Sequence, residues 1–121
     1  MISNLANIQM MLLYNLLTIK HINIKNEFEI NVSLFKIIPV FYANYIYENN
    51  QIFINRLYCE STFRRMGICT YIISHIKNEA KKKNIEQIAL IVYEGNFQAI
   101  NCYKKNGFTH RLNSEMICRI K

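Results

Sequence analysis

Residue types and motifs that are scarce in this sequence exclude several classes of protein. Only 3 glycines and 1 proline occur among the 121 residues, so we expect neither a flexible linker nor a low-complexity segment. No two of the 4 cysteines form a C-x-x-C pair, and no histidine stands at zinc-ligand spacing from them. We therefore expect no metal, and a core that is held by apolar packing alone.

The apolar stretch from Ile8 to Ile19 lacks the features of a targeting segment. No basic region precedes it and no small-residue cleavage site follows it, which argues against a secretory signal. It is also too short, and too interrupted by Asn and Gln, to span a bilayer. We therefore expect a cytoplasmic protein with no membrane partner, whose cysteines are free thiols.

Composition is typical of one globular domain that spans residues 1–121, with 51% hydrophobic and 19% charged residues. The net charge of +7 suits a polyanionic partner: nucleic acid, acidic lipid or a phosphorylated cofactor. A general lysine excess is more often a solvated surface than a binding face. A small nucleic-acid-binding domain therefore stays an alternative that rests on charge alone, and we expect no nucleic acid.

Apolar periodicity in the first half predicts one helix followed by three strands. The helix is expected over residues 3–20 and a loop over 21–27. Strands are expected at 28–35, 40–48 and 52–60, with Asn49-Asn50 as the turn of a hairpin.

Patterns in the second half predict two further helices and three strands, and hence a mixed α/β domain. A helix over 67–83 has apolar residues at every fourth position and ends in three lysines, which complement the helix dipole. The other expected elements are a strand at 87–93 that is buried on both faces, a helix at 96–105 that ends at Asn106-Gly107, and strands at 108–111 and 115–121.

The turn before the second helix has the composition of a phosphate site. Unpaired N–H groups and the positive end of the dipole meet at a helix start, which suits phosphate. Gly67 has no Cβ to block the approach of a phosphate, and Arg64 and Arg65 add positive charge. Taken alone, one glycine before a helix is more often a plain turn.

A second pattern surrounds the third helix. Asn96 is a good helix cap, and Tyr103 follows two turns later on the same side. An amide and a phenol therefore lie along one edge of this helix. A capped helix with a half-buried tyrosine is the simpler interpretation.

Together these motifs resemble the GNAT superfamily of coenzyme A-dependent N-acyltransferases, over residues 52–108 and loosely over the whole chain. Arg64-x-x-Gly67-x-Cys69 follows the family's phosphate loop, R/Q-x-x-G-x-G/A, except at Cys69, which we expect to act as a small apolar residue. The family pattern N-x-x-A-x-x-x-Y-x-x-x-G-F is matched by Asn96, Ala99, Tyr103, Gly107 and Phe108. The resemblance implies the GNAT fold, a mixed central sheet with flanking helices, here with a shortened N-terminal part.

The resemblance further implies an enzyme that moves an acetyl group from acetyl-coenzyme A to a primary amine by direct attack. The pantetheine arm would lie between two strands that splay apart, and Tyr103 would be the general acid that meets the leaving thiolate. The residues that the resemblance assigns to binding of the co-substrate are Leu57, Tyr58, Cys59, Arg64, Arg65, Met66, Gly67, Ile68, Cys69, Thr70, Asn96 and Tyr103.

The general base and the acceptor are less defined. Asn55 stands where many family members have an acidic residue, so Glu60 is our second catalytic candidate, with a solvated strand-end charge or a water chain as alternatives. Ile91 stands where the branch that acetylates ribosomal proteins often has a Glu, which argues against that branch. A homodimer that completes the acceptor site, and an inactive module that only senses acetyl-coenzyme A, stay open. We expect His75 and His110, for which the sequence shows no partner, to be packing or surface residues.

Overall fold

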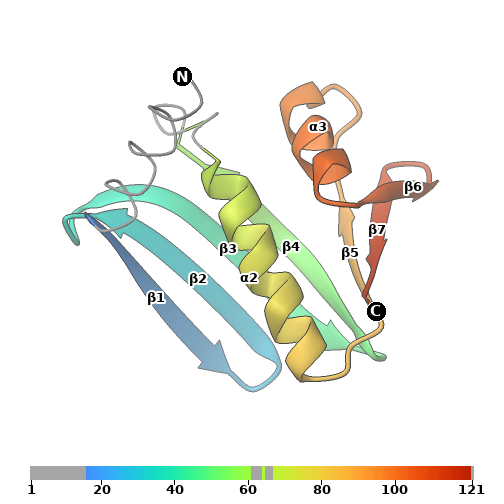
Figure 1. Cartoon of the computed structure of the whole chain (residues 1–121), viewed down its shortest axis with the longest axis horizontal. Helices are drawn as coiled ribbons and strands as arrows, with labels where there is room; N and C mark the ends of the chain where they lie inside the picture. The colour runs from blue at the N-terminus through green and yellow to red at the C-terminus, as the bar shows by residue number, and fades with distance from the viewer. Residues whose placement is uncertain (1–15, 61–63, 65–66, 121) are drawn as a thin grey trace, which may run out of the picture.

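The computed structural model describes residues 16–60, 64 and 67–120. One sheet of seven strands has the order β1-β2-β3-β4-β5-β7-β6 (Figure 1). Only β4 and β5 pair in parallel, and the other neighbours are antiparallel. The elements are β1 (Leu17–Ile24), β2 (Glu27–Leu34), β3 (Ile38–Glu48), β4 (Gln51–Cys59), α2 (Ile68–Lys82), β5 (Gln87–Ile91), α3 (Phe97–Lys105), β6 (Thr109–Leu112) and β7 (Glu115–Arg119). This is the mixed α/β architecture that the sequence predicts.

The first strand, β1, corrects the prediction of a helix over 3–20 and a loop over 21–27. Residues 17–24 pair with β2 along their whole length, from Leu17↔Leu34 to Ile24↔Glu27. Half of these residues are Thr or Ile, which favour the extended backbone. The apolar alternation slips by one position at Lys20-His21, which hides the two-residue period. Residues 3–15 of the predicted helix lie outside the described residues.

The remaining elements follow the predicted order closely. Asn49 and Asn50 both have positive φ, at 50° and 62°, as the tight turn between β3 and β4 requires. The predicted apolar stripe of α2 is buried, and Ile73 joins Ile68, Ile72, Ile76 and Ala80 there. The sequence therefore predicts this helix and hairpin correctly.

Helices α2 and α3 lie side by side (Figure 1). The Asn106 side chain donates to the Thr70 hydroxyl at 3.3 Å, and the Lys77 ammonium donates to the Asn106 carbonyl. Phe108, which follows α3, is buried against Tyr103 with ring centroids 5.8 Å apart. The two hydrogen bonds of Asn106 fix the end of α3 relative to the start and middle of α2.

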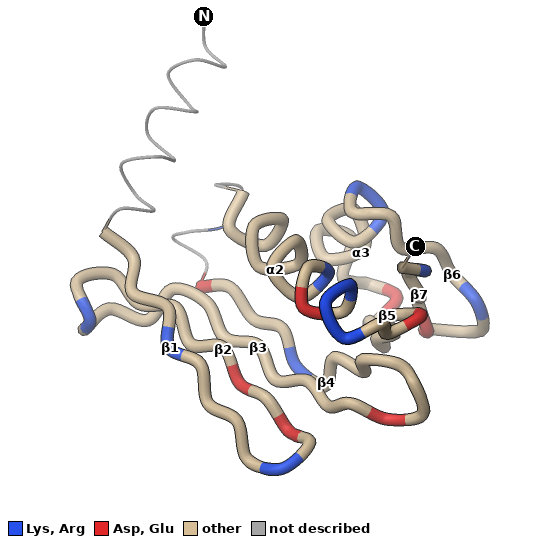
Figure 2. The backbone as a smooth tube through the Cα atoms, turned by 60° about the horizontal axis from the view of Figure 1, so that its bottom comes forward, with Lys and Arg blue, Asp and Glu red and all other residues tan. Residues whose placement is uncertain are grey.

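The lysine run at the end of α2 appears as a basic cluster in Figure 2. Lys81 and Lys82 occupy the last turn, as expected of cations that complement the helix dipole. Lys83 does more than face solvent, because its ammonium lies 4.8 Å from the Phe28 ring and 4.4 Å from the Tyr47 ring. The run therefore has a structural role at the end of the helix.

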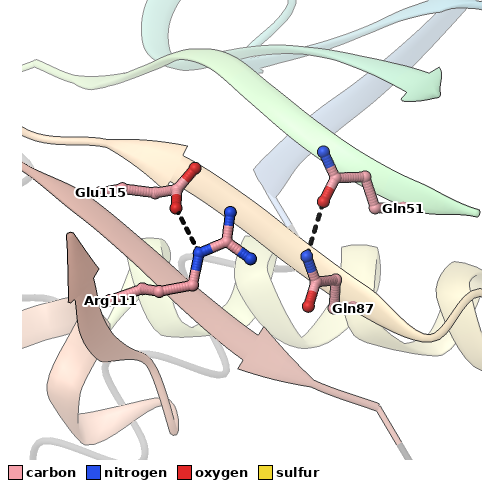
Figure 3. Close-up of polar contacts among 4 residues, drawn as sticks. All are labelled: Gln51, Gln87, Arg111 and Glu115. Carbon is pink, nitrogen blue, oxygen red and sulfur yellow. Dashed lines mark hydrogen bonds and ion pairs between the residues drawn. The ribbon is translucent and has the colours of Figure 1, made fainter. Parts of the chain in front are cut away.

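Strands β4 and β5 pair over only part of their length. Pairing runs from Gln51↔Gln87 to Ile54↔Leu90, whereas β4 continues to Cys59. At the paired end, the Gln87 amide donates to the Gln51 side chain at 2.7 Å, whereas an Arg111–Glu115 ion pair of 2.6 Å joins β6 to β7 beside Ile91, at the end where β4 and β5 part (Figure 3). Since the sheet parts after Leu90, Ile91 is 66% exposed, and the prediction of a strand buried on both faces holds only up to Leu90.

No helix among the described residues combines the length and apolar character that crossing a membrane requires.

Candidate functional site

A cavity of about 570 Å³ lies at the place where β4 and β5 part. The backbone of β4 beyond Ile54 has no strand partner on its β5 side. Such an unpaired edge can accept an extended ligand in place of a strand. The cavity is lined by Tyr42, Ile54, Asn55, Arg56, Leu57, Tyr58, Leu90, Ile91, Val92, Tyr93, Asn96 and Tyr103.

The start of α2 lies close to the end of β4. Gly67 adopts the left-handed conformation, φ 80° and ψ 5°, in which a side chain would be strained. The next three residues, Ile68 to Thr70, have first-turn amides without an intrahelical acceptor, and no acidic residue lies in that turn. Arg64 is held against the end of β4, since its Nε donates to the Cys59 carbonyl at 3.0 Å and its guanidinium lies 5.9 Å from the Tyr58 ring centroid. Such a helix start favours an anion.

Two of the residues predicted to bind the co-substrate, Arg65 and Met66, lie outside the described residues. Cys59 ends β4, and Leu57 and Tyr58 line the cavity, as do Asn96 and Tyr103. Cys69 and Thr70 lie in the first turn of α2, away from the lining. The structure therefore places the described candidates in two adjacent groups, at the strand edge and at the helix start.

Helix α3 and its cap bring an amide and a phenol to the cavity. Asn96 caps the helix, because its Oδ1 accepts from the Ala99 amide at 3.2 Å, as the sequence predicts. Tyr103 lies two turns on and is only 6% exposed. Burial, and then the neighbouring Cys69 and Cys102, raise the pKa of Tyr103, so its phenol keeps the proton at neutral pH.

A β-bulge in β4 directs the Asn55 side chain toward Asn44 of β3. Tyr45 pairs with Ile54 and Asn44 pairs with Arg56, so Asn55 is an extra residue in β4. A bulge redirects the side chain of the extra residue. The Asn55 Nδ2 donates to Asn44 Oδ1 at 3.0 Å, and Asn44 Nδ2 donates to Glu27 Oε1 at 2.9 Å. A carboxylate on β2 is thereby linked to the cavity through two amides.

A smaller hollow of about 180 Å³ adjoins the cavity and shares Tyr42 and Tyr58 with it. Glu60 lines this hollow and does not line the main cavity. The Tyr42 hydroxyl donates to Glu29 Oε1 at 3.2 Å. The structure therefore does not bring Glu60 and Tyr103, the two catalytic candidates, into one cavity.

Sequence reasoning missed Glu27, Asn44 and Tyr42. They lie on β2 and β3, on the face opposite α2, and Figure 2 shows acidic positions along β2. Polar residues at every second position of these strands were the available signal, but solvent would give the same pattern.

His75 is a packing residue, as the sequence predicts, and the structure gives it a partner that the sequence does not reveal. Its ring lies 4.9 Å from the ring of His21, centroid to centroid, on β1. Burial, and then His21, lower the pKa of His75. This pair joins α2 to the edge strand and does not line the cavity. In the part of the chain that the structure describes, no group of three or more His, Cys, Asp or Glu side chains is arranged to hold a metal ion.

Comparison with known families gives a match to the acetyltransferase (GNAT) family model over residues 33–108. A curated relative, "Probable N-acetyltransferase san" of Drosophila melanogaster, is 44% identical over 59 residues. That match covers 48% of this chain and 32% of the fly protein, so this chain matches about a third of the relative's length.

Solved structures share the fold at low sequence identity. The PaiA N-acetyltransferase of Thermoplasma acidophilum, solved in complex with coenzyme A, aligns with a TM-score of 0.69 at 20% identity, over 79% of this chain and 61% of that one. The ribosomal-protein-S18-alanine N-acetyltransferase of Escherichia coli gives 0.72 at 14% identity, over 82% and 72% of the two chains.

Proposed function

Because this chain belongs to the acetyltransferase (GNAT) family, we propose that it transfers an acetyl group from acetyl-coenzyme A to a primary amine by direct attack. The observation that carries the proposal is the parting of β4 and β5 beside Tyr103, with the start of α2 at the end of β4. In this arrangement a strand edge and a proton donor line one cavity, and an anion site lies beside it at the start of α2.

The co-substrate would lie along the unpaired edge of β4. The main-chain groups of Leu57 to Cys59 have no β5 partner, so an extended amide-containing arm can pair with them. Asn96 lines the other side of the cavity and offers its amide there. First-turn amides of α2 would hold the diphosphate, with Gly67 removing the obstruction of a side chain. The coenzyme A bound to PaiA is consistent with this proposal.

Tyr103 would act as the general acid. When an amine attacks the thioester, the sulfur leaves as a thiolate and needs a proton or a hydrogen-bond donor. The raised pKa of Tyr103 keeps its phenol protonated, and the residue lines the cavity, where its hydroxyl would meet the leaving thiolate. Its burial also shields the transfer from bulk water.

Asn55 would position the amine through the direction of its hydrogen bonds. An ionised carboxylate only accepts hydrogen bonds, so Glu27 must receive the NH₂ group of Asn44. Asn44 must then offer its oxygen to the NH₂ group of Asn55. This leaves the Asn55 oxygen to accept a hydrogen bond from the attacking amine in the cavity. Glu27 and Asn44 are therefore positioning residues in this proposal.

The amine's proton would leave through solvent. The described residues that line the cavity include no Asp, Glu or His, and Glu60 faces the adjoining hollow. The amine then reacts as its neutral form, and kcat/KM should rise with pH towards the pKa of the free amine. Glu60→Gln should leave this profile unchanged, whereas a lost or shifted ascending limb would identify Glu60 as the base.

A panel of primary amines, assayed for thiol release from acetyl-coenzyme A, tests the proposed activity. We expect amine-dependent release, together with the acetylated amine by mass spectrometry. The alternative, an inactive sensor, is favoured by Asn55 in place of an acidic residue, and predicts acetyl-coenzyme A binding without release. The proposal of activity fails if the protein binds the thioester and no amine accelerates its consumption.

A further inference from the structure

Two cysteines meet where the start of α2 faces α3. The Sγ atoms of Cys69 and Cys102 are 2.6 Å apart, close to the roughly 2.0 Å of a disulfide bond. Both are free thiols in this structure and both are half-buried, so a small reagent can approach them. The two helices are already held together here, since Asn106 of the α3 end donates to Thr70. A bond between the sulfurs therefore needs little movement of either helix.

The surroundings of the pair give the two sulfurs different roles. Cys102 Sγ is hydrogen-bonded to Cys69 Sγ, and Asn106 Nδ2 donates to Cys102 Sγ from 3.7 Å. The hydrogen bond between the two sulfurs, and further on the charge of Lys105, lower the pKa of Cys102, while the same hydrogen bond raises the pKa of Cys69. A thiolate is the reactive form, so Cys102 attacks and Cys69 follows.

We propose that Cys69 and Cys102 form a dithiol site that reacts with low-molecular-weight disulfides and closes into an intramolecular disulfide. The Cys102 thiolate attacks one sulfur of the reagent, its S–S bond breaks, and one thiolate leaves and takes up a proton. Cys69 then loses its proton and attacks Cys102 Sγ, which releases the second thiol. The protein loses two hydrogens, and the reagent is reduced to two thiols.

The other two cysteines are poorer sites. Cys118 is 5% exposed, and burial raises the pKa of Cys59. Cys59 is close enough to Cys69 and Cys102 to influence their charges, so it is the natural competitor. The bond between Cys69 and Cys102 would tie the helix start, where we propose the diphosphate binds, to the helix that carries Tyr103.

Peptide mapping tests the site directly. Trypsin separates all four cysteines, placing Cys59 in residues 57–64, Cys69 in 66–77, Cys102 in 84–104 and Cys118 in 112–119. After incubation of the folded protein with glutathione disulfide at neutral pH, free thiols are blocked before digestion. We expect peptide 66–77 linked to 84–104, and an intact mass lower by two hydrogens.

Single substitutions separate the two roles. Cys69→Ser should stop the reaction at a stable glutathione adduct on Cys102, and Cys102→Ser should slow the reaction of Cys69 by roughly 10-fold or more. Cys59→Ser is the matched control and should leave the linkage unchanged. A linkage that involves Cys59, adducts spread over the cysteines without a linkage, or thiols that all stay reduced in the wild-type protein would each overturn the proposal.

Discussion

The two walls of the cavity are built in different ways. On the donor side, which we assign to acetyl-coenzyme A, residues 96–103 at the cavity and 67–70 beside it each belong to one helix and its cap, so neighbours in the sequence are neighbours in space. On the acceptor side, Glu27, Asn44 and Asn55 come from three strands and meet only through the register of the sheet. We therefore expect substitutions in the donor wall to change acetyl-coenzyme A binding or chemistry, and those in the acceptor wall to change recognition of the amine.

The largest effect is expected from Tyr103→Phe, in the donor wall. Loss of the phenolic proton should lower kcat by roughly 10-fold to 1,000-fold with little change in either KM. Steady-state kinetics with both substrates measures it. Tyr93→Phe is the control, because Tyr93 lines the same cavity but is 79% exposed. Equal kcat values in the Tyr103 variant and the wild type would remove Tyr103 from the mechanism.

A reversal of charge at Glu27 tests the acceptor wall, where we expect recognition of the amine to change and acetyl-coenzyme A binding to stay the same. In Glu27→Lys an ammonium, which only donates hydrogen bonds, replaces a carboxylate, which only accepts them. The Asn44 amide must then rotate to offer its oxygen to the ammonium, and the Asn55 amide rotates in turn, so that the NH₂ group of Asn55 faces the cavity. The KM for the amine should rise by about 10-fold, as for one lost hydrogen bond, while the KM for acetyl-coenzyme A stays constant.

Glu48→Lys makes the same charge change at the exposed end of β3 and serves as the control for Glu27. Similar amine KM values in the two lysine variants would show that the chain of amides has no part in recognition.

Asn96→Ala, in the donor wall, should lower the stability of the protein, and this effect should be smaller than the kinetic effects of the Tyr103 and Glu27 variants. Loss of the cap to the Ala99 amide should lower the free energy of unfolding by about 1 kcal/mol. Urea denaturation measures the change. Asn96→Asp keeps an oxygen at the cap and should restore most of the stability, whereas equal losses in both variants would mean that the cap does not stabilise α3.

The smallest effect is expected on the pH dependence of stability, from the contact between His21 of β1 and His75 of α2. Because the pKa of His75 is lowered in the folded state, the unfolded chain binds the proton more readily as the pH falls below about 6.5. Stability should therefore decrease from pH 7 to pH 5, and amide exchange in β1 should speed up. His75→Phe should flatten this decrease in the melting temperature.

His110→Phe, at an exposed position of β6, should retain the wild-type pH slope of the melting temperature. A slope in the His75 variant as steep as in the His110 variant would place the pH sensitivity elsewhere in the chain.

Local patterns predicted the donor side well. The apolar stripe of α2, the Asn96 cap and the approach of Tyr103 to the same cavity all follow from spacing within one helix. The parting of β4 and β5 came from the family resemblance, and the structure contains it.

The acceptor side could not be predicted in the same way. The extra residue at Asn55 depends on the register of β3 against β4, which is set by the whole sheet and not by nearby residues. Strand β1 was missed because its apolar alternation slips at Lys20-His21, and an edge strand is specified by its partner, here β2, more than by its own pattern.

Calorimetric titration of the protein with coenzyme A tests most directly whether the start of α2 holds the diphosphate. The wild type should bind, and Gly67→Glu, which adds a side chain and a negative charge there, should weaken binding by roughly 10-fold or more. Gly107→Ala is the matched control, since Gly107 also has a positive φ of 89° but lies at the far end of α3, and it should bind as the wild type does. An absence of binding by the wild type, or equal affinity in the Gly67 variant, would contradict the assignment.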